Sequence, residues 1–133
     1  ALSKSEDNPV YYVQYAHARV ASVQRQLQEK GFDYRESGAD DLILLCEPHE
    51  IALIRRIAQY PEQLAIAARA LEPHQIATYL RELAGDFHAY YNAHHFIVED
   101  EALRNARITL ARSAQQIIRN GLGILGVSAP DAM

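Results

Sequence analysis

Two segments of this sequence combine tyrosines with hydrogen-bonding side chains, and such residues can hold a nucleic-acid base. Residues 11–15 include three tyrosines, and residues 88–92 include two tyrosines flanked by a histidine and an asparagine. Flat rings beside polar side chains are typical of sites that bind unstacked bases. Tyrosines that are partly buried at helix contacts would give the same pattern. The spacing alone therefore leaves both interpretations open.

The basic residues are mostly arginine, which supplies eleven of the thirteen. Arginine favours planar hydrogen bonding and stacking over simple point charges. Four arginines near the C-terminus lie within an arc of roughly 140° on a predicted helix, away from its apolar stripe: Arg104, Arg107, Arg112 and Arg119. Such an arc is usually a solvated face, and contact with phosphates is the alternative. The net charge of −4 argues against non-specific binding of nucleic acid.

No other chemistry has a recognisable motif in this sequence. There is no glycine-rich phosphate loop, His-Glu-x-x-His pair or nucleophile elbow. Cys46 follows two leucines and has no basic neighbour, so we expect a buried, unreactive thiol. His88, His94 and His95 lack the helical spacing of a metal site, so we expect surface or capping histidines and no metal.

The elements that must position these residues are all predicted to be helices. Apolar residues recur at spacings of three and four, and prolines mark several helix starts. We predict helices over residues 9–31, 48–60, 62–70, 73–92 and 99–120. We expect residues 31–41 to form a loop, Leu42–Leu45 a packed lead-in to a helix, and 93–98 either a connection or a helix end with apolar anchors. After Asn120-Gly121, an apolar tail is expected to turn back at Gly123 and Gly126. The fold class is therefore an all-α bundle of about five main helices.

Four of the predicted helices have an apolar stripe, and in the last helix it consists of Leu103, Ala106, Leu110, Ala114 and Ile117. In the first helix, Tyr12, Tyr15 and Arg19 form a second stripe beside the apolar one. The core stripe of the helix over 73–92 consists of Ile76, Leu80, Leu83 and Phe87. For the helix over 48–60 we expect a stripe of Ile51, Leu53, Ile54 and Ile57.

Length and composition indicate one domain with its own core. The chain has 133 residues, and we expect a polar lead-in over 1–8 followed by a single domain over 9–133. It has no apolar run of transmembrane length and no signal-peptide pattern. Its single cysteine is typical of a reducing compartment. Because the chain does not begin with methionine, we expect a processed chain or an excised domain.

Four motifs, in order along the chain, resemble one known family. Residues 8–19 (NPVYYVQYAHAR) resemble the junction where the catalytic domain of arginyl-tRNA synthetases meets the C-terminal anticodon-binding domain. Residues 71–92 (LEPHQIATYLRELAGDFHAYYN) resemble the middle of that domain. Residues 101–104 (EALR) resemble the Asp-Ala-Leu-Arg run that gives the domain its name, with Glu101 in place of the aspartate. The end, from Asn120 to Met133, resembles the C-terminus of such enzymes.

This resemblance implies an all-α domain that binds the anticodon stem and loop of arginine tRNA. It implies base contacts by Tyr12, Tyr15, Tyr90, Tyr91 and Met133, and phosphate contacts by Arg104, Arg107 and Arg112, while Arg19 is expected to be structural. The parent enzyme would be a class I arginine–tRNA ligase that uses ATP and magnesium. This chain has no catalytic motif, so we expect it to be inactive alone and to need no cofactor.

The expected partners are arginine tRNA and the parent's own catalytic domain, without membrane or DNA, in the cytoplasm. The alternative is a helical protein–protein interaction module that does not bind RNA. A protein interface would place exposed aliphatic residues beside the tyrosine stripe, whereas an RNA interface would place arginine there.

Overall fold

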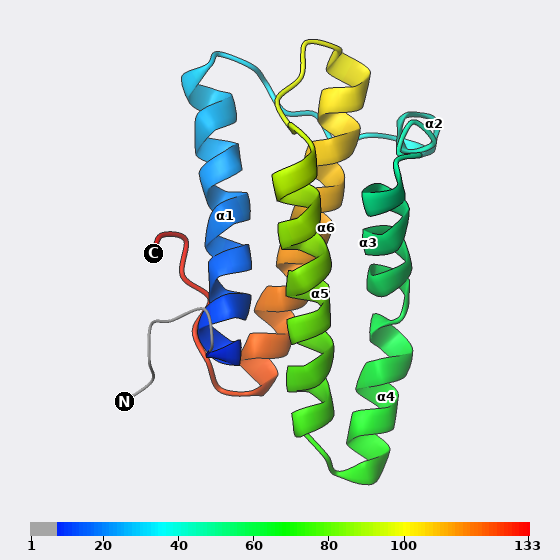
Figure 1. The fold of residues 1–133 in the computed structure, drawn as a ribbon, viewed down its shortest axis with the longest axis vertical. Helices are drawn as coiled ribbons and strands as arrows, with labels where there is room; N and C mark the ends of the chain where they lie inside the picture. Colours follow the sequence, from blue (N-terminus) through cyan, green and yellow to red (C-terminus); the bar gives the residue numbers. More distant parts are fainter. Residues whose placement is uncertain (1–7) are drawn as a thin grey trace.

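The computed structural model describes residues 8–133 as a bundle of helices (Figure 1). In chain order the helices are α1 (Pro9–Glu29), α2 (Ala39–Leu42), α3 (Pro48–Ala58), α4 (Tyr60–Ala70), α5 (His74–Ala93) and α6 (Glu101–Ile124). Since α2 is a single turn, the predicted all-α bundle of about five main helices is confirmed, and the described residues include no strand. The predicted lead-in lies outside the described residues except for Asn8. No helix in 8–133 is both long and apolar enough to cross a membrane.

The helix starts follow from local capping chemistry. The Asn8 side chain accepts a hydrogen bond from the Val10 amide at 2.9 Å, and Pro9 occupies the first position of α1. The Asp100 side chain does the same for α6, accepting from the Ala102 amide at 3.0 Å. Both caps therefore satisfy amides that have no partner inside the helix.

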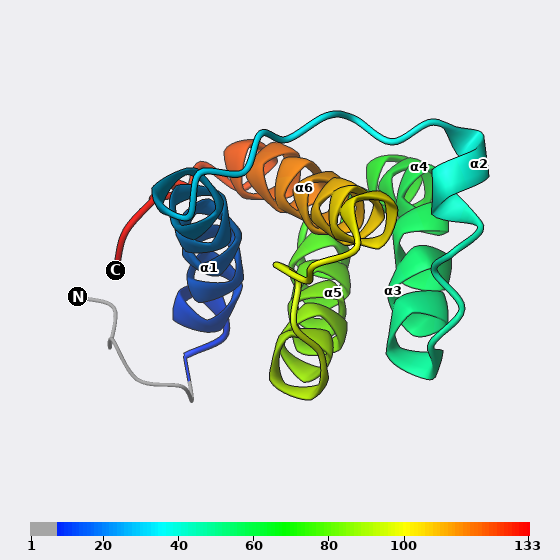
Figure 2. The same cartoon turned by 90° about the horizontal axis from the view of Figure 1, so that it is seen from above.

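Helix α5 is the central element of the bundle. It packs against α1 on one side and against α3 and α4 on the other, while α6 covers a further side (Figure 2). The predicted stripe of α5 is confirmed, because each of its members is at most 1% exposed; they are Ile76, Leu80, Leu83 and Phe87. They belong to one core that also includes Val20 and Ile118.

The segment before α3 packs less than the sequence suggested. Cys46 is exposed, so the prediction of a buried thiol is wrong. Ile43 is 78% exposed, and of the run Leu42–Leu45 only Leu45 is buried. The reason is that α2, one turn long, contacts α6 at the rim of the bundle and presents no apolar face to the core.

The stripe of α3 is also narrower than predicted. Leu53 is fully buried, but Ile51 and Ile54 are 37% and 39% exposed. Glu50, three residues before Leu53, is fully buried in their place. Because α3 has α5 and α6 on one side only, its other apolar residues remain near solvent.

Helix α6 continues past its predicted end at Asn120-Gly121 and stops at Ile124. Gly121 does not end the helix; it allows close packing, because a Cβ atom there would lie 2.7 Å from both methyl carbons of Leu80. The positive φ that glycine tolerates is found later, at Gly126 (73°).

The C-terminal tail returns along α1 as predicted, but it turns at Gly126 and not at Gly123, which still lies inside α6. Three side chains of α1 hold backbone carbonyls of the tail: Gln14 Nε2 donates to Ser128 O at 2.9 Å, His17 Nδ1 to Pro130 O at 2.9 Å and Arg25 Nη1 to Asp131 O at 3.0 Å. The Nε2 atom of His17 accepts from Arg119 Nε at 3.2 Å, so the buried imidazole joins α1, α6 and the tail.

Candidate nucleic-acid interface

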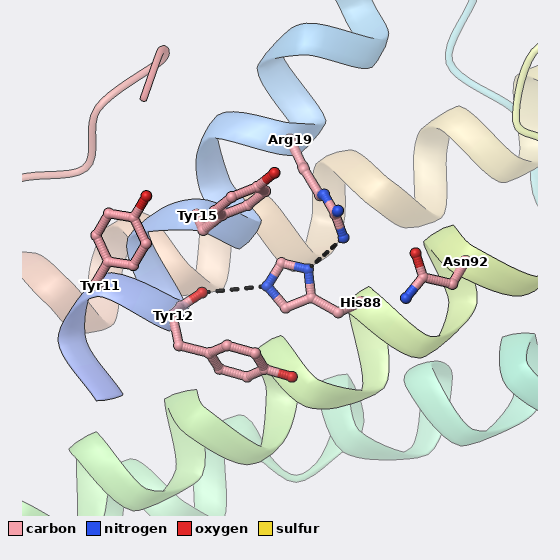
Figure 3. Close-up of a pocket in the computed structure, with 6 residues that line it drawn as sticks. All are labelled: Tyr11, Tyr12, Tyr15, Arg19, His88 and Asn92. Atoms are coloured by element: carbon pink, nitrogen blue, oxygen red, sulfur yellow. Dashed lines mark hydrogen bonds between the residues drawn. The ribbon is translucent and has the colours of Figure 1, made fainter. Parts of the chain in front are cut away.

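A cleft of about 240 Å³ lies between α1 and α5 (Figure 3). It is lined by Tyr11, Tyr12, Tyr15, Arg19, His88 and Asn92. On α1, Tyr15 follows Tyr12 by three residues and Tyr11 by four, and Arg19 follows Tyr15 by four, which places these side chains along one side of the helix. The α5 residues are four apart and face them. The second stripe predicted for the first helix is therefore one wall of this cleft.

His88 connects the two walls. Arg19 Nη1 lies 3.0 Å from His88 Nδ1, and His88 Nε2 lies 3.2 Å from the carbonyl oxygen of Tyr12 (Figure 3). A guanidinium can only donate, so Nδ1 accepts and Nε2 carries the proton that it donates to the carbonyl. This arrangement requires the neutral Nε2-H tautomer, and it fixes the imidazole against the Tyr12 ring at a centroid distance of 4.6 Å.

The Arg19 guanidinium lies between two tyrosine rings. Its central carbon is 4.7 Å from the Tyr15 ring centre and 4.2 Å from the Tyr91 ring centre. Each cation–π contact contributes about 0.5–1 kcal/mol at an exposed site. Arg19, expected to be structural, thus holds an aromatic surface in place, with the Tyr15 ring 36% exposed.

The predicted base-contacting tyrosines do not all lie together. Tyr12 and Tyr15 line the cleft, and Tyr91 joins them through Arg19. Tyr90 is fully buried on the other side of α5, because consecutive residues of a helix point about 100° apart. Its hydroxyl donates to Glu50 at 2.6 Å, and burial together with that carboxylate raises its pKa. The prediction that Tyr90 contacts a base is therefore wrong.

Met133, also predicted to contact a base, lies at the end of the tail. It is 53% exposed and is not among the residues that line the cleft. Its contact with a base stays a prediction.

Two of the three arginines predicted to contact phosphates are buried. Arg107 Nε donates to Glu50 at 2.9 Å and Arg107 Nη1 to the His95 carbonyl at 2.8 Å. Arg104 donates to two backbone carbonyls before α6, and its guanidinium lies 4.0 Å from the Phe32 ring centre. Both are structural, so these two predictions are wrong. Arg112 is exposed beside Tyr34 and outside the cleft, and its role stays a prediction.

The prediction that His88 is a surface or capping histidine is wrong, because it is 8% exposed and joins α1 to α5, and sequence reasoning also missed its contact with Arg19. The signal was present in their spacing, because Arg19 follows Tyr15 by four residues and His88 precedes Asn92 by four. What could not be read from either helix alone is that the two faces meet, which depends on the packing of α1 on α5.

A cleft that joins tyrosine rings to an arginine and an asparagine has the side chains that hold unstacked nucleic-acid bases. Comparison with known proteins agrees. The chain belongs to the DALR anticodon binding domain family, whose model matches residues 13–133. The predicted resemblance to this family is thereby confirmed.

Close relatives and solved structures support this assignment. The chain is similar to arginine–tRNA ligases from Thioalkalivibrio sulfidiphilus (56% identical over the whole chain) and Legionella pneumophila (54%) and spans 23% of the length of each. Arginyl-tRNA synthetase of Thermus thermophilus matches 97% of the chain with a TM-score of 0.80 and 33% identity, over 22% of its own length. A putative arginyl-tRNA synthetase of Campylobacter jejuni matches 98%, with a TM-score of 0.78 and 26% identity, over 28% of its length.

Proposed function

We propose that residues 9–133 bind the anticodon stem and loop of arginine tRNA through the cleft between α1 and α5. The observation that carries the proposal is the guanidinium of Arg19 held between the rings of Tyr15 and Tyr91. It pairs the tyrosine stripe with arginine and not with exposed aliphatic residues. That pairing is the feature that favours RNA over a protein partner.

In this proposal the cleft holds bases that leave the loop's stack. The Tyr12 and Tyr15 rings supply flat surfaces, and each base–aromatic stack contributes about 1–3 kcal/mol. Asn92 offers both amide donors and a carbonyl acceptor to the edge of a base. The Arg19 side chain retains N–H groups beyond the one directed at His88, and these suit a phosphate or a base edge.

The parent protein would be a longer arginine–tRNA ligase. This chain matches 23% of the length of its relative from Thioalkalivibrio sulfidiphilus, which is therefore about four times as long. We place the catalytic part of the parent, with its use of ATP and magnesium, outside these residues. We assign no catalytic step to any residue here and expect the isolated chain not to aminoacylate tRNA. A cytoplasmic location follows as part of the same proposal.

A second surface suits the catalytic part of the parent. An apolar groove where α4, α5 and α6 end or begin includes Leu71 and Ile124, which are 86% and 54% exposed. Exposed apolar side chains at a groove are typical of protein contacts. This face is separate from the tyrosine cleft, so the protein-interaction hypothesis applies here as a contact within the parent.

A titration tests the RNA proposal. The chain would be titrated with a labelled anticodon arm of arginine tRNA and, in parallel, with the arm of a non-cognate tRNA, at two salt concentrations. We expect tighter binding of the cognate arm at both salts, because hydrogen bonds from Asn92 and Arg19 to base edges depend on the identity of the bases, whereas phosphate contacts do not. Equal affinity for the two arms would contradict specific recognition by this chain.

A further inference from the structure

A second cleft continues the first along α1 and α5. It has a volume of about 360 Å³, and the residues that matter here are Gln26, Lys30, Tyr91, Asn92, His95 and Phe96. Asn92 lines both clefts. The Tyr91 ring borders the second cleft, while the guanidinium lying over that ring belongs to Arg19 of the first. The two clefts are therefore neighbouring parts of one surface.

The side chains of the second cleft suit a base and its phosphate. The Tyr91 and Phe96 rings are 6.0 Å apart, and Phe96 is 4% exposed, so an aromatic pair forms the inner wall. Gln26 and His95 offer hydrogen bonds at the rim. Lys30, one of two lysines in the sequence, adds a positive charge.

The charge of the lining differs from that of the whole chain. The sequence has 17 acidic residues against 13 basic ones. Within the described part of the chain, neither cleft includes a carboxylate among its lining residues. The lining has Arg19 and Lys30 as its charged side chains, so this surface can accept an anionic ligand although the sequence is acidic overall.

The length of the surface indicates a polymeric ligand. On α1 the first cleft is centred near Tyr15 and the second near Gln26, eleven residues later. At about 1.5 Å per residue the separation is roughly 16 Å. A nucleotide advances about 3.4 Å along a stacked strand and further along an unstacked one, but in neither case as far as this separation. One ligand that fills both clefts must therefore span several nucleotides.

We infer that the second cleft binds a further unpaired nucleotide of the same RNA loop, several positions from the base held at Tyr15, with Lys30 at a phosphate. The inference rests on the proposed function. It assigns to Gln26, Lys30 and His95 a role in RNA binding, and it makes Asn92 the residue where the two binding positions meet.

The test uses single variants of each cleft and matched controls. Lys30→Gln and His95→Ala report on the second cleft, and Tyr15→Ala on the first. Arg55→Gln on α3 and His74→Ala at the start of α5 are exposed controls outside both clefts. The probes are the anticodon arm of arginine tRNA and a series of variants of this arm, each of which has a single abasic nucleotide at a different loop position. Binding is measured by fluorescence anisotropy across a salt series.

We expect Lys30→Gln to weaken binding more than Arg55→Gln and to reduce the slope of log affinity against log salt by about 0.7, the value for one phosphate on a single strand. His95→Ala should weaken binding about two- to tenfold, the effect of one hydrogen bond. One abasic loop position, different from the position that reports on Tyr15, should weaken binding to the unmodified chain but have no further effect in His95→Ala.

The outcomes separate this inference from the proposed function. If Tyr15→Ala weakens binding while Lys30→Gln and His95→Ala bind as well as their controls, the second cleft does not bind RNA and the inference is wrong. The proposed function of the first cleft would still hold. If the anticodon arm does not bind the unmodified chain at all, the proposed function fails and the inference fails with it.

Discussion

Tyr12 and Tyr15 differ in how much of the fold depends on them. Tyr15 is exposed, whereas Tyr12 is half-buried and packs against the core. Its hydroxyl also lies near α5, 3.7 Å from where a Cβ atom on Gly85 would be. The two rings line the same cleft, but only one can be removed without opening the contact between helices.

We expect Tyr15→Ala to weaken binding of the anticodon arm by about 1–3 kcal/mol, because it removes a stacking surface. The free energy of unfolding should fall by no more than about 1 kcal/mol, because the exposed ring loses its contact with Arg19 and little else. Anisotropy titration and urea unfolding measure the two quantities. Tyr15→Phe, which keeps the ring, is the control and should bind nearly as well. Equal loss of binding in both variants would mean that the hydroxyl, not the ring, makes the contact.

The buried carboxylate of Glu50 connects three helices. It lies on α3, accepts a hydrogen bond from Tyr90 of α5 and pairs with Arg107 of α6. Such a network satisfies every charged member only while all partners are present, since a buried charge without a partner is costly.

We predict that Glu50→Ala lowers the free energy of unfolding by about 3–5 kcal/mol, because Arg107 is left buried without its counterion. Tyr90→Phe should cost less, about 1–3 kcal/mol, because the ion pair remains and one hydrogen bond is lost. Urea unfolding of both variants checks this order. If Tyr90→Phe proved the more costly change, the hydroxyl and not the ion pair would be the main support of the network.

At the scale of the element, the contact of α6 with α5 depends on a glycine. A methyl group at Gly121 would lie 2.7 Å from the Leu80 methyl carbons, and Leu80 is only 1% exposed, so it has little room to move. Gly123, two residues later in the same helix, has no atom within 4 Å of the equivalent position.

Gly121→Ala should therefore destabilise the protein by about 1–3 kcal/mol through overpacking. Gly123→Ala should stabilise it by up to about 1 kcal/mol, because alanine is the better helix former. Thermal and urea unfolding of the matched pair measure both effects. A stabilised Gly121→Ala would show that α6 can shift away from α5 without loss.

At the scale of the whole molecule, His17 links α1, α6 and the C-terminal tail. Burial lowers its pKa below the ordinary value of 6.5 and Arg119 acts in the same direction, while the Pro130 carbonyl and Asp131 oppose them. The folded protein thus keeps His17 neutral at a pH where the unfolded chain has begun to bind a proton.

From this we predict that stability falls as the pH is lowered. Below about pH 6.5 the unfolded state binds more protons than the folded state. The contribution of His17 to the free energy of unfolding is therefore complete above pH 6.5. It is lost as the pH falls from 6.5 to the lower pKa that His17 has in the folded protein. Urea unfolding between pH 7.5 and 5 measures the fall. His17→Gln, although less stable at pH 7.5, should show a shallower fall; an equal fall in both would assign the effect to other groups.

How much the sequence could predict also depends on scale. The stripe of α5 and the proline-marked helix starts are local patterns, so their prediction was confirmed. The fates of Tyr90, Arg104 and Arg107 depend on which helix lies opposite, and no spacing within one helix contains that information. The run Leu42–Leu45 misled for the same reason, since an apolar residue is buried only where a partner surface reaches it.

The tyrosine cleft gives the protein an optical signal of its own. The sequence contains eight tyrosines and no tryptophan, so its ultraviolet emission comes from tyrosine alone. Four of these rings lie at the two clefts: Tyr11, Tyr12, Tyr15 and Tyr91. A base that stacks on them will alter their emission, while a buried ring such as Tyr90 is shielded. Occupancy of this surface can therefore be followed without attaching a dye to the protein.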